Sequence, residues 1–267
     1  MILQMKNIIK TYGKVIANDN VSIDLNEGEI LAIVGENGAG KSTIMKILYG
    51  LEKADSGEIF VKGEKVSFNS PSDAMKLHIG MVQQHFMLYG TMTVTENIVY
   101  NNEISRYGFF DMKANQEKVR QLSEKYGLNV DPTAIINDCP VGTQQRVEIL
   151  KTLYQNADII IFDEPSAVLT PGEVDDLLQT MKKLSESGKS IILITHKLNE
   201  VMAVADRITV MRTGRVIDTV NKSDTSIEEL SYMMIGRHTN EPILNQLNPG
   251  NTLLNVSNVT LGSPTGK

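Results

Sequence analysis

Residues 30–43 read ILAIVGENGAGKST, and this stretch decides the fold. Its first five residues form a short apolar run, as expected for a strand that is buried on both faces of a parallel sheet. The segment that follows contains Gly-x-x-x-x-Gly-Lys-Ser and leads into the helical pattern IMKILYG. A strand, a glycine-rich loop and a helix in this order predict a phosphate-binding loop, and disfavour a glycine-rich turn with a chance Lys-Ser pair.

The residue types in this loop suit a polyphosphate. Glycines let the backbone approach closely with its N–H groups turned inward, and the helix N-terminus adds a partial positive charge. Lys41 can reach the β- and γ-phosphates, and the Ser42 hydroxyl can ligate Mg²⁺. We therefore predict that the chain binds a nucleoside triphosphate. The predicted loop residues are Gly35, Glu36, Asn37, Gly38, Ala39, Gly40, Lys41, Ser42 and Thr43.

The composition is that of a soluble globular protein. Of the 267 residues 41% are hydrophobic and 22% are charged, with a net charge of −6, which gives no sign of a polyanion-binding protein. The single cysteine, Cys139, excludes an intrachain disulfide and fits a reducing compartment. No apolar run approaches membrane-spanning length, and Lys6, Lys10 and Lys14 stand where a signal peptide would need an apolar core. Any work at a membrane is expected from its cytoplasmic surface, through partners.

Strands alternate with helical patterns around the loop, which predicts an α/β fold with a parallel sheet. Alternating runs at 2–10 and 19–25, together with a hairpin at 55–68, predict an antiparallel β lobe beside the nucleotide. From about Val94 to Lys125 the pattern is helical and polar, with turn residues at Tyr107 and Gly108, and predicts a helical insertion. Further helices and strands are expected at 71–77, 78–84, 143–155, 157–165, 172–188, 189–196, 198–205, 207–220 and 227–237.

The end of the chain differs from the rest. Residues 237–251 are polar, contain Pro242, Pro249 and Gly250, and are interpreted as a linker. Residues 252–267, TLLNVSNVTLGSPTGK, resemble the opening MILQMKNIIKTYGK. Either they begin a second, homologous domain, which is our interpretation, or they form a simple C-terminal strand.

Polar residues close two of the predicted buried strands. Asp163 and Glu164 follow IIIF, where Asp163 can hold Mg²⁺ through a water and Glu164 can face a water that attacks the γ-phosphate. His196 closes IILIT, at the end of a parallel sheet where ligands collect. The alternatives are that the two acids cap a helix and that the histidine is structural.

These motifs, in this order, resemble the nucleotide-binding domain of ABC transporters over residues 1 to about 237. The resemblance implies a P-loop NTPase fold with a parallel-sheet core, an antiparallel β lobe and a helical insertion. It further implies that Tyr12 stacks on adenine with Val15 near the ribose, that Gln84 (preceded by Gln83) is linked to Mg²⁺, and that Glu164 and His196 are catalytic. The implied metal ligands are Ser42, Gln84 and Asp163.

Two segments depart from the family pattern. The signature, usually L-S-G-G-Q, reads Cys139-Pro140-Val141-Gly142-Thr143, in which Pro140 removes a serine hydroxyl and a backbone N–H. The loop after Glu164 usually ends S-A-L-D, whereas Thr170 stands at the position of that acid. The half that holds a nucleotide is therefore expected to be complete, and the half offered to a partner to be weakened.

The stretches IGMVQQHFML, QQRVEILKTLY, EPSAVLTP and ELSYMMIGR resemble the first cassette of tandem-cassette ATPases of simple-sugar and nucleoside importers. This resemblance implies an ATP-hydrolysing subunit at the cytoplasmic face of the membrane. Its implied partners are a second cassette in the same polypeptide, integral-membrane permease subunits and, indirectly, an extracytoplasmic solute-binding protein, with no nucleic acid. The alternative is a soluble ABC-type ATPase that acts on ribosomes or DNA. Met87, Leu88 and Tyr89 form either an exposed apolar patch for a permease helix or part of the core.

Overall fold

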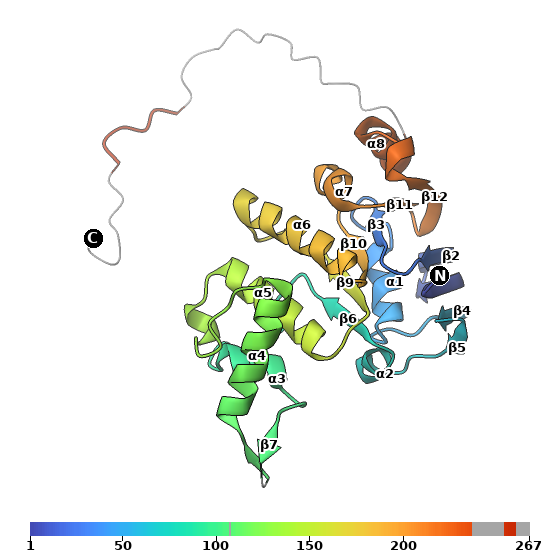
Figure 1. Ribbon diagram of the computed structural model, residues 1–267. Helices are drawn as coiled ribbons and strands as arrows, with labels where there is room; N and C mark the ends of the chain where they lie inside the picture. Colours follow the sequence, from blue (N-terminus) through green and yellow to red (C-terminus); the bar gives the residue numbers. More distant parts are fainter. Residues whose placement is uncertain (107, 237–253, 260–267) are drawn as a thin grey trace. The chain divides into compact units, whose positions relative to one another are not determined.

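The computed structural model describes residues 1–106, 108–236 and 254–259 of the chain (Figure 1). Two compact units are distinguished, Met1–Arg237 and His238–Lys267. The fold described below belongs to the first of them.

A six-stranded sheet forms the centre of the first unit. Its strand order is β12-β11-β3-β10-β9-β6, with β12 antiparallel to β11 and the other neighbouring pairs parallel. Every residue of three of its strands, β3, β9 and β10, is buried, because helices or another sheet cover both faces of the sheet. The strands are β3 (Ile30–Val34), β6 (Ile79–Val82), β9 (Ile159–Asp163), β10 (Ser190–Ile194), β11 (Arg207–Arg212) and β12 (Arg215–Asn221). The predicted parallel-sheet core is confirmed.

The register of this sheet brings four strand ends to one edge. Asp163 pairs with Ile194 across β9 and β10, and Val82 pairs with Phe162 across β6 and β9. Gly35 follows directly after β3. The residues that follow the carboxyl ends of these strands therefore meet where ligands of parallel sheets bind.

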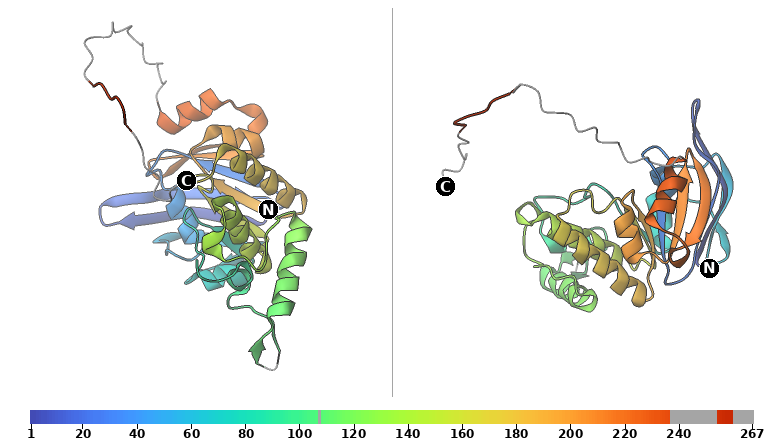
Figure 2. Two further views of the ribbon diagram at one scale, coloured as in Figure 1. Left: turned by 90° about the vertical axis from the view of Figure 1, so that its left-hand side faces the viewer. Right: turned by 90° about the horizontal axis from the view of Figure 1, so that it is seen from above.

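A second, antiparallel sheet has the order β2-β1-β4-β5 and confirms the predicted β lobe. Its strands are β1 (Leu3–Tyr12), β2 (Val15–Leu25), β4 (Ser56–Val61) and β5 (Glu64–Val66). Strand β2 begins at Val15, earlier than the predicted start at residue 19, because Tyr12 pairs with Val15 and closes a hairpin over Gly13, which has φ +59. This hairpin projects beyond the rest of the unit in the left view of Figure 2.

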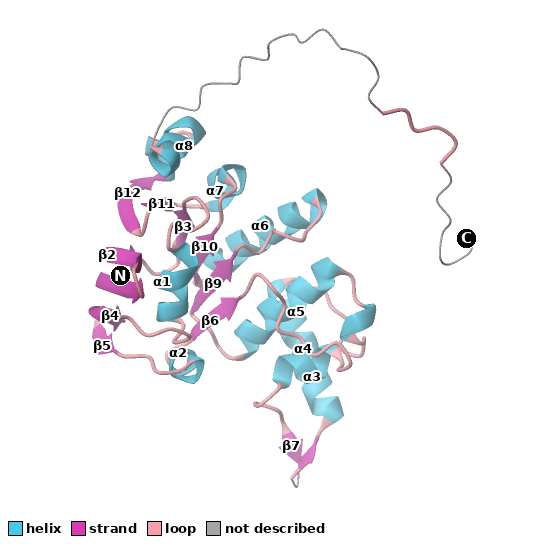
Figure 3. Cartoon of the chain, turned by 180° about the vertical axis from the view of Figure 1, so that it is seen from behind, coloured by secondary structure: helices cyan, strands magenta, loops and turns pink. Residues whose placement is uncertain are grey.

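Helices cover both faces of the parallel sheet, and alternate residues of its strands enter different cores. Ile159 and Ile161 pack with α1 and the antiparallel sheet, whereas Ile160 and Phe162 pack with α5 and α6. Helix α1 lies between the two sheets in Figure 3. The helices are α1 (Lys41–Leu48), α2 (Pro71–Lys76), α5 (Val141–Tyr154), α6 (Pro171–Glu186), α7 (Leu198–Val204) and α8 (Ile227–Ile235), with short 3₁₀ turns at Ile136–Asp138 and Lys222–Asp224.

The predicted helical insertion is present as α3 (Val94–Val99) and α4 (Met112–Tyr126), packed against α5. Between them lies a two-stranded hairpin that the helical pattern did not predict, formed by β7 (Ser105–Arg106) and β8 (Phe109–Phe110). Gly108 turns this hairpin at φ +82, and Tyr107 lies outside the described residues. The hairpin protrudes at the lower end of the insertion in Figure 1.

Helix α5 begins at Val141, two residues before the predicted start, with Pro140 at its N-cap. Proline is compatible with this position because the first N–H groups of a helix lack intrahelical acceptors. As a result, Val141, Gly142 and Thr143 of the altered signature lie in the first turn of the helix, and Cys139 and Pro140 precede it.

The predicted linker 237–251 lies outside the described residues. Of the predicted strand 252–267 the structure describes 254–259, where neither helix nor strand is present. None of the helices in the described part of the chain is long and apolar enough to span a membrane.

Candidate functional site

The phosphate loop is held tightly between two other backbone segments. A Cβ atom on Gly35 would collide with the carbonyl oxygen of Met211, and one on Gly40 would collide with that of Ala17. Gly40 also has φ +96, a conformation that other residues rarely adopt. Gly35 is therefore required for space, and Gly40 for space as well as for conformation.

Lys41 folds back over this loop. Its buried ammonium group donates to the carbonyl oxygen of Gly35 at 2.7 Å and to that of Glu36 at 3.1 Å. Burial lowers the pKa of Lys41, while Glu164 and Asp163 act in the opposite direction. The first N–H groups of α1 have no side-chain cap. A cation and free N–H donors thus converge on the loop, as binding of phosphate groups requires.

Ser42 and Asp163 meet at the end of β9. The Ser42 hydroxyl donates to Asp163 Oδ1 at 3.1 Å, and burial raises the pKa of Asp163. A hydroxyl and a carboxylate side by side are hard oxygen ligands and fit Mg²⁺, which keeps several waters and binds through few carboxylates plus phosphate oxygens. Within the described residues no cluster of three or more His, Cys, Asp and Glu that could hold a metal occurs.

Glu164 and His196 are adjacent, at 3.4 Å between Oε1 and Nδ1. Glu164 has φ +47, a left-handed conformation that is uncommon for a residue with a side chain, and its N–H donates to the carbonyl oxygen of Ile194 at 2.9 Å. Strained residues of this kind cluster at functional sites. The geometry therefore places both predicted catalytic residues at the same edge as the phosphate loop.

Gln84 follows β6 at this edge but is not engaged. It is exposed, and no hydrogen bond joins it to Ser42 or Asp163, all three of which the structure describes. Gln83, the preceding residue, lines a groove together with residues of α2 and α5. The predicted magnesium linkage of Gln84 therefore remains a prediction.

Tyr12 and Val15 face each other at the β1–β2 hairpin and are 44% and 64% exposed. The ammonium group of Lys10 lies 5.1 Å from the centre of the Tyr12 ring. Farther along β2, the Asn18 amide donates to the carbonyl oxygen of Gly40 at 3.1 Å. Asn18 thus anchors the strand that carries Val15 to the phosphate loop. The Tyr12 ring at the end of this hairpin is exposed and available to stack on a base.

The altered signature is satisfied from within the chain. Glu173 Oε1 accepts the Gly142 N–H at 3.1 Å, and Glu173 Oε2 accepts the N–H and hydroxyl of Thr170 at 2.9 and 2.8 Å. One carboxylate therefore joins the N-termini of α5 and α6. Glu173 was not predicted from the sequence, although Thr-x-x-Glu at the start of a helix is the signal of a capping box.

A second network was also missed. Lys197 Nζ donates to the carbonyl oxygen and hydroxyl oxygen of Ser166 at 3.1 and 3.0 Å, and Glu200 Oε2 accepts the Ser166 hydroxyl at 2.8 Å. The signal in the sequence is Lys-x-x-Glu directly after His196. These contacts hold the loop after Glu164 against the start of α7.

The model of one protein family, described as ABC transporter, matches residues 18–167, which include the phosphate loop, Asp163 and Glu164. The chain belongs to the ABC transporter family. The resemblance recognised in the sequence is thereby confirmed.

Relatives of this ABC transporter chain are twice as long. Over 236 residues it is 56% identical to the nucleoside import ATP-binding protein NupA of Lactococcus lactis, covering 88% of this chain and 47% of that protein. Over 266 residues it is 48% identical to the guanosine import ATP-binding protein NupO of Bacillus subtilis, covering 99% and 52%. The chain thus spans about half the length of the curated relatives it matches.

Solved ABC cassettes share the fold. The ADP conformation of MJ1267, an ATP-binding cassette of an ABC transporter, superposes with a TM-score of 0.77 at 26% identity and covers 88% of this chain and 99% of that one. The dimeric post-hydrolysis cassette MJ0796, bound to ADP and Pi, gives 0.71 at 28% identity and covers 82% and 98%. The predicted P-loop NTPase fold is confirmed.

Proposed function

We propose that the chain is the ATP-hydrolysing part of an importer that moves a nucleoside or a simple sugar through a membrane permease. The observation that carries this proposal is the convergence of Lys41, the Ser42–Asp163 pair and Glu164 on one sheet edge. In the proposed function, the phosphate loop binds the phosphates of ATP. Mg²⁺ bound by Ser42, Asp163 and, after a local shift, Gln84 would supply charge stabilisation.

Glu164 is the group that prepares the attacking water. Its carboxylate can accept a proton from water, and His196 beside it can donate to the γ-phosphate or orient the carboxylate. Tyr12 offers its ring to the adenine and Val15 its side chain to the ribose.

The names of the similar relatives support the class of solute. NupA and NupO are nucleoside and guanosine import proteins, and a ribose import ATP-binding protein RbsA of Bacillus subtilis is 39% identical over 242 residues. We therefore place the protein at the cytoplasmic face of the membrane, with a permease and an extracytoplasmic solute-binding protein as direct and indirect partners.

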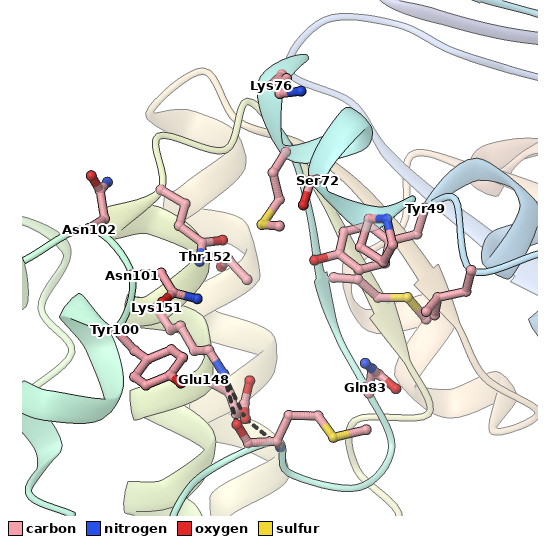
Figure 4. Close-up of a pocket in the computed structure, with 16 residues that line it drawn as sticks. Tyr49, Ser72, Lys76, Gln83, Tyr100, Asn101, Asn102, Glu148, Lys151 and Thr152 are labelled. Carbon is pink, nitrogen blue, oxygen red and sulfur yellow. Dashed lines mark hydrogen bonds and ion pairs between the residues drawn. The ribbon is translucent and has the colours of Figure 1, made fainter. Parts of the chain in front are cut away.

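A groove of about 590 Å³ is the proposed contact for the permease. It lies between α2, β6 and the C-terminal half of α5, and Figure 4 shows Tyr49 and Tyr100 among the side chains that line it. Met75 and Met87 also line it. Met87 and Tyr89 are exposed, whereas Leu88 packs into the core around α5, so both alternatives for this segment hold in part. A groove that combines apolar side chains such as Met75 with polar ones such as Gln83 and Asn101 suits an amphipathic helix.

We further propose that residues 1–236 are one cassette, that 237–251 are a linker and that 252–267 begin a second cassette. The similarity of the two ends of the chain and the double length of the relatives support this division. The second cassette would provide the signature that completes the site around Lys41.

Uptake of labelled solutes by cells that lack and then regain the protein tests the function. Loss and recovery of nucleoside or ribose uptake, and failure of recovery by Glu164→Gln, are expected. Unchanged uptake of both solutes would contradict the importer. The soluble alternative, action on ribosomes or DNA, predicts co-sedimentation with ribosomes or retention on DNA, for which neither the charge of −6 nor the named relatives provide support.

A further inference from the structure

Two side chains of α5, those of Glu148 and Lys151, form hydrogen bonds with the backbone of Met87 at one end of the proposed permease groove. The Glu148 carboxylate accepts the N–H of Met87 at 2.6 Å, and the Lys151 ammonium group donates to the carbonyl oxygen of Met87 at 2.8 Å. Figure 4 shows Glu148 and Lys151 together, with Gln83 and Tyr100 to either side of them. We call these contacts the Met87 clip.

Burial gives the clip its strength. Glu148 is 4% exposed, and its Oε1 lies 4.0 Å from Lys151 Nζ. Burial raises the pKa of Glu148, while Lys151 and the Met87 N–H lower it. Because an unpartnered carboxylate is costly to bury, breaking the contact between Glu148 and the Met87 N–H leaves a buried acceptor unsatisfied, and the clipped arrangement is favoured.

The clip connects parts of the site that are distant in sequence. Helix α5 begins at the signature and carries Glu148 and Lys151 farther along. Met87 is three residues after Gln84, and the segment that contains both follows β6 next to Asp163 at the end of β9. The one residue of this segment that α5 holds at both backbone polar groups is thus close to Gln84.

We propose that Glu148 and Lys151 are positioning residues for Gln84, because they fix the segment 84–87 to α5 and so set the position of Gln84 relative to Asp163. The proposal rests on the proposed function, in which Gln84 acts on Mg²⁺. It gives α5 a second task besides presenting the signature: each shift of the helix moves Gln84 with it.

The test measures the Mg²⁺ dependence of ATP hydrolysis by the complete protein. Glu148→Ala and Lys151→Met each raise the Mg²⁺ concentration for half-maximal turnover about ten-fold, the size expected for one lost charged hydrogen bond. Glu148→Gln, which can still accept the Met87 N–H, restores most of the loss. ATP affinity without Mg²⁺ stays unchanged, as does all activity in the control Glu117→Ala on α4, an exposed partner of Arg120 at the same spacing.

A double-mutant cycle with Gln84→Ala separates this inference from the proposed function. If the clip acts through Gln84, then Lys151→Met adds nothing to the Mg²⁺ requirement once Gln84 is alanine. If Gln84→Ala raises the requirement and Lys151→Met adds its full effect to it, the clip acts elsewhere and the inference fails. If Gln84→Ala alone changes nothing, the role of Gln84 in the proposed function is wrong. Lys151 is partly exposed, so its variant is expected to fold even if Glu148→Ala does not.

Discussion

In the proposed function the phosphate-loop edge of the sheet and the signature end of α5 each face a nucleotide, yet the two regions differ in how their polar groups are satisfied. At the sheet edge, Lys41 and Asp163 are buried with a loop carbonyl and a hydroxyl as partners, and no carboxylate caps α1. At the signature end, a carboxylate of the same chain, that of Glu173, already accepts the Gly142 N–H.

This difference indicates that the sheet edge is ready for an anion, whereas the signature end is already neutralised in part. A helix N-terminus attracts a negative group, and Glu173 supplies one from α6. Pro140 at the N-cap of α5 lacks the hydroxyl that the serine of the usual signature would offer. The chain is thus expected to bind a nucleotide well by itself and to cover a partner's nucleotide poorly.

Glu164→Gln gives the largest expected effect and tests the sheet edge. The amide keeps the size and polarity of the side chain but cannot accept a proton from the attacking water, so turnover at this site falls about 10²–10⁴-fold. ATP binding, measured by equilibrium titration, is unchanged. Near wild-type phosphate release in single-turnover assays would show that another group orients the water.

Restoring the signature tests the other side of the comparison. A hydrogen bond to a charged group contributes roughly 1.5–3 kcal/mol, so Pro140→Ser combined with Val141→Gly and Thr143→Gln raises ATP-driven association and turnover about ten-fold. Sedimentation and phosphate release measure both. The unchanged chain is expected to be largely monomeric with ATP and slow in hydrolysis, because a homodimer would offer Pro140 and Thr143 at both sites.

A native chain that dimerises tightly with ATP and hydrolyses it fast would contradict this view of the signature. Equal behaviour of the two proteins would show that Glu173, and not the missing hydroxyl, sets the weakness.

Removal of the Tyr12 ring tests the adenine platform. Base–aromatic stacking contributes about 1–3 kcal/mol in nucleic-acid systems, so Tyr12→Ala weakens ATP binding roughly ten-fold. GTP is affected similarly, since stacking discriminates little between purines. Tyr100→Ala, which removes an equally exposed ring from the groove, leaves ATP affinity unchanged in the same titration. Unaltered affinity in the Tyr12 variant would place the base elsewhere.

Asp163→Asn gives the smallest effect, on the stability of the nucleotide-free protein. Burial raises the folded-state pKa of Asp163 above its ordinary value of 3.8, so its charged form opposes folding at neutral pH. The amide removes this cost and raises Tm by about 2–4 °C per 1 kcal/mol gained. The gain shrinks as the pH falls through the raised pKa towards 3.8, which thermal unfolding at several pH values measures. A lower Tm of the Asp163→Asn variant at pH 7 would contradict the view that the charged Asp163 carboxylate opposes folding.

The sequence predicted those parts of the fold that depend on local pattern. The buried runs before Gly35, Asp163 and His196 have to be central strands, and Gly-Lys-Ser at a strand–helix junction leaves little choice of chemistry. The predicted start of β2 at residue 19 was wrong. Val15 and Ile16 are both exposed, so this part of the strand lacks the alternation of buried and exposed side chains by which strands are predicted.

The side-chain contacts between distant segments could not be predicted. The Met87 clip joins residues 61 and 64 positions apart, and the Glu173–Gly142 contact joins residues 31 positions apart. Their formation depends on how α5 and α6 pack, which periodicity does not encode. The strand before Gln84 was predicted and is present as β6, but no hydrogen bond joins the Gln84 side chain to Ser42 or Asp163, all of which the structure describes.

Because one carboxylate serves two helix N-termini, the positions it joins are not free to evolve separately. A side chain at Gly142 would press on the Glu173 carboxylate, with its Cβ 2.5 Å from Oε1, and a shorter acid at 173 would release both Gly142 and Thr170. We therefore expect positions 142, 170 and 173 to covary among homologous sequences. A lineage that regains an acid at 170 should lose the one at 173, and its signature would then be open to the nucleotide of a neighbour.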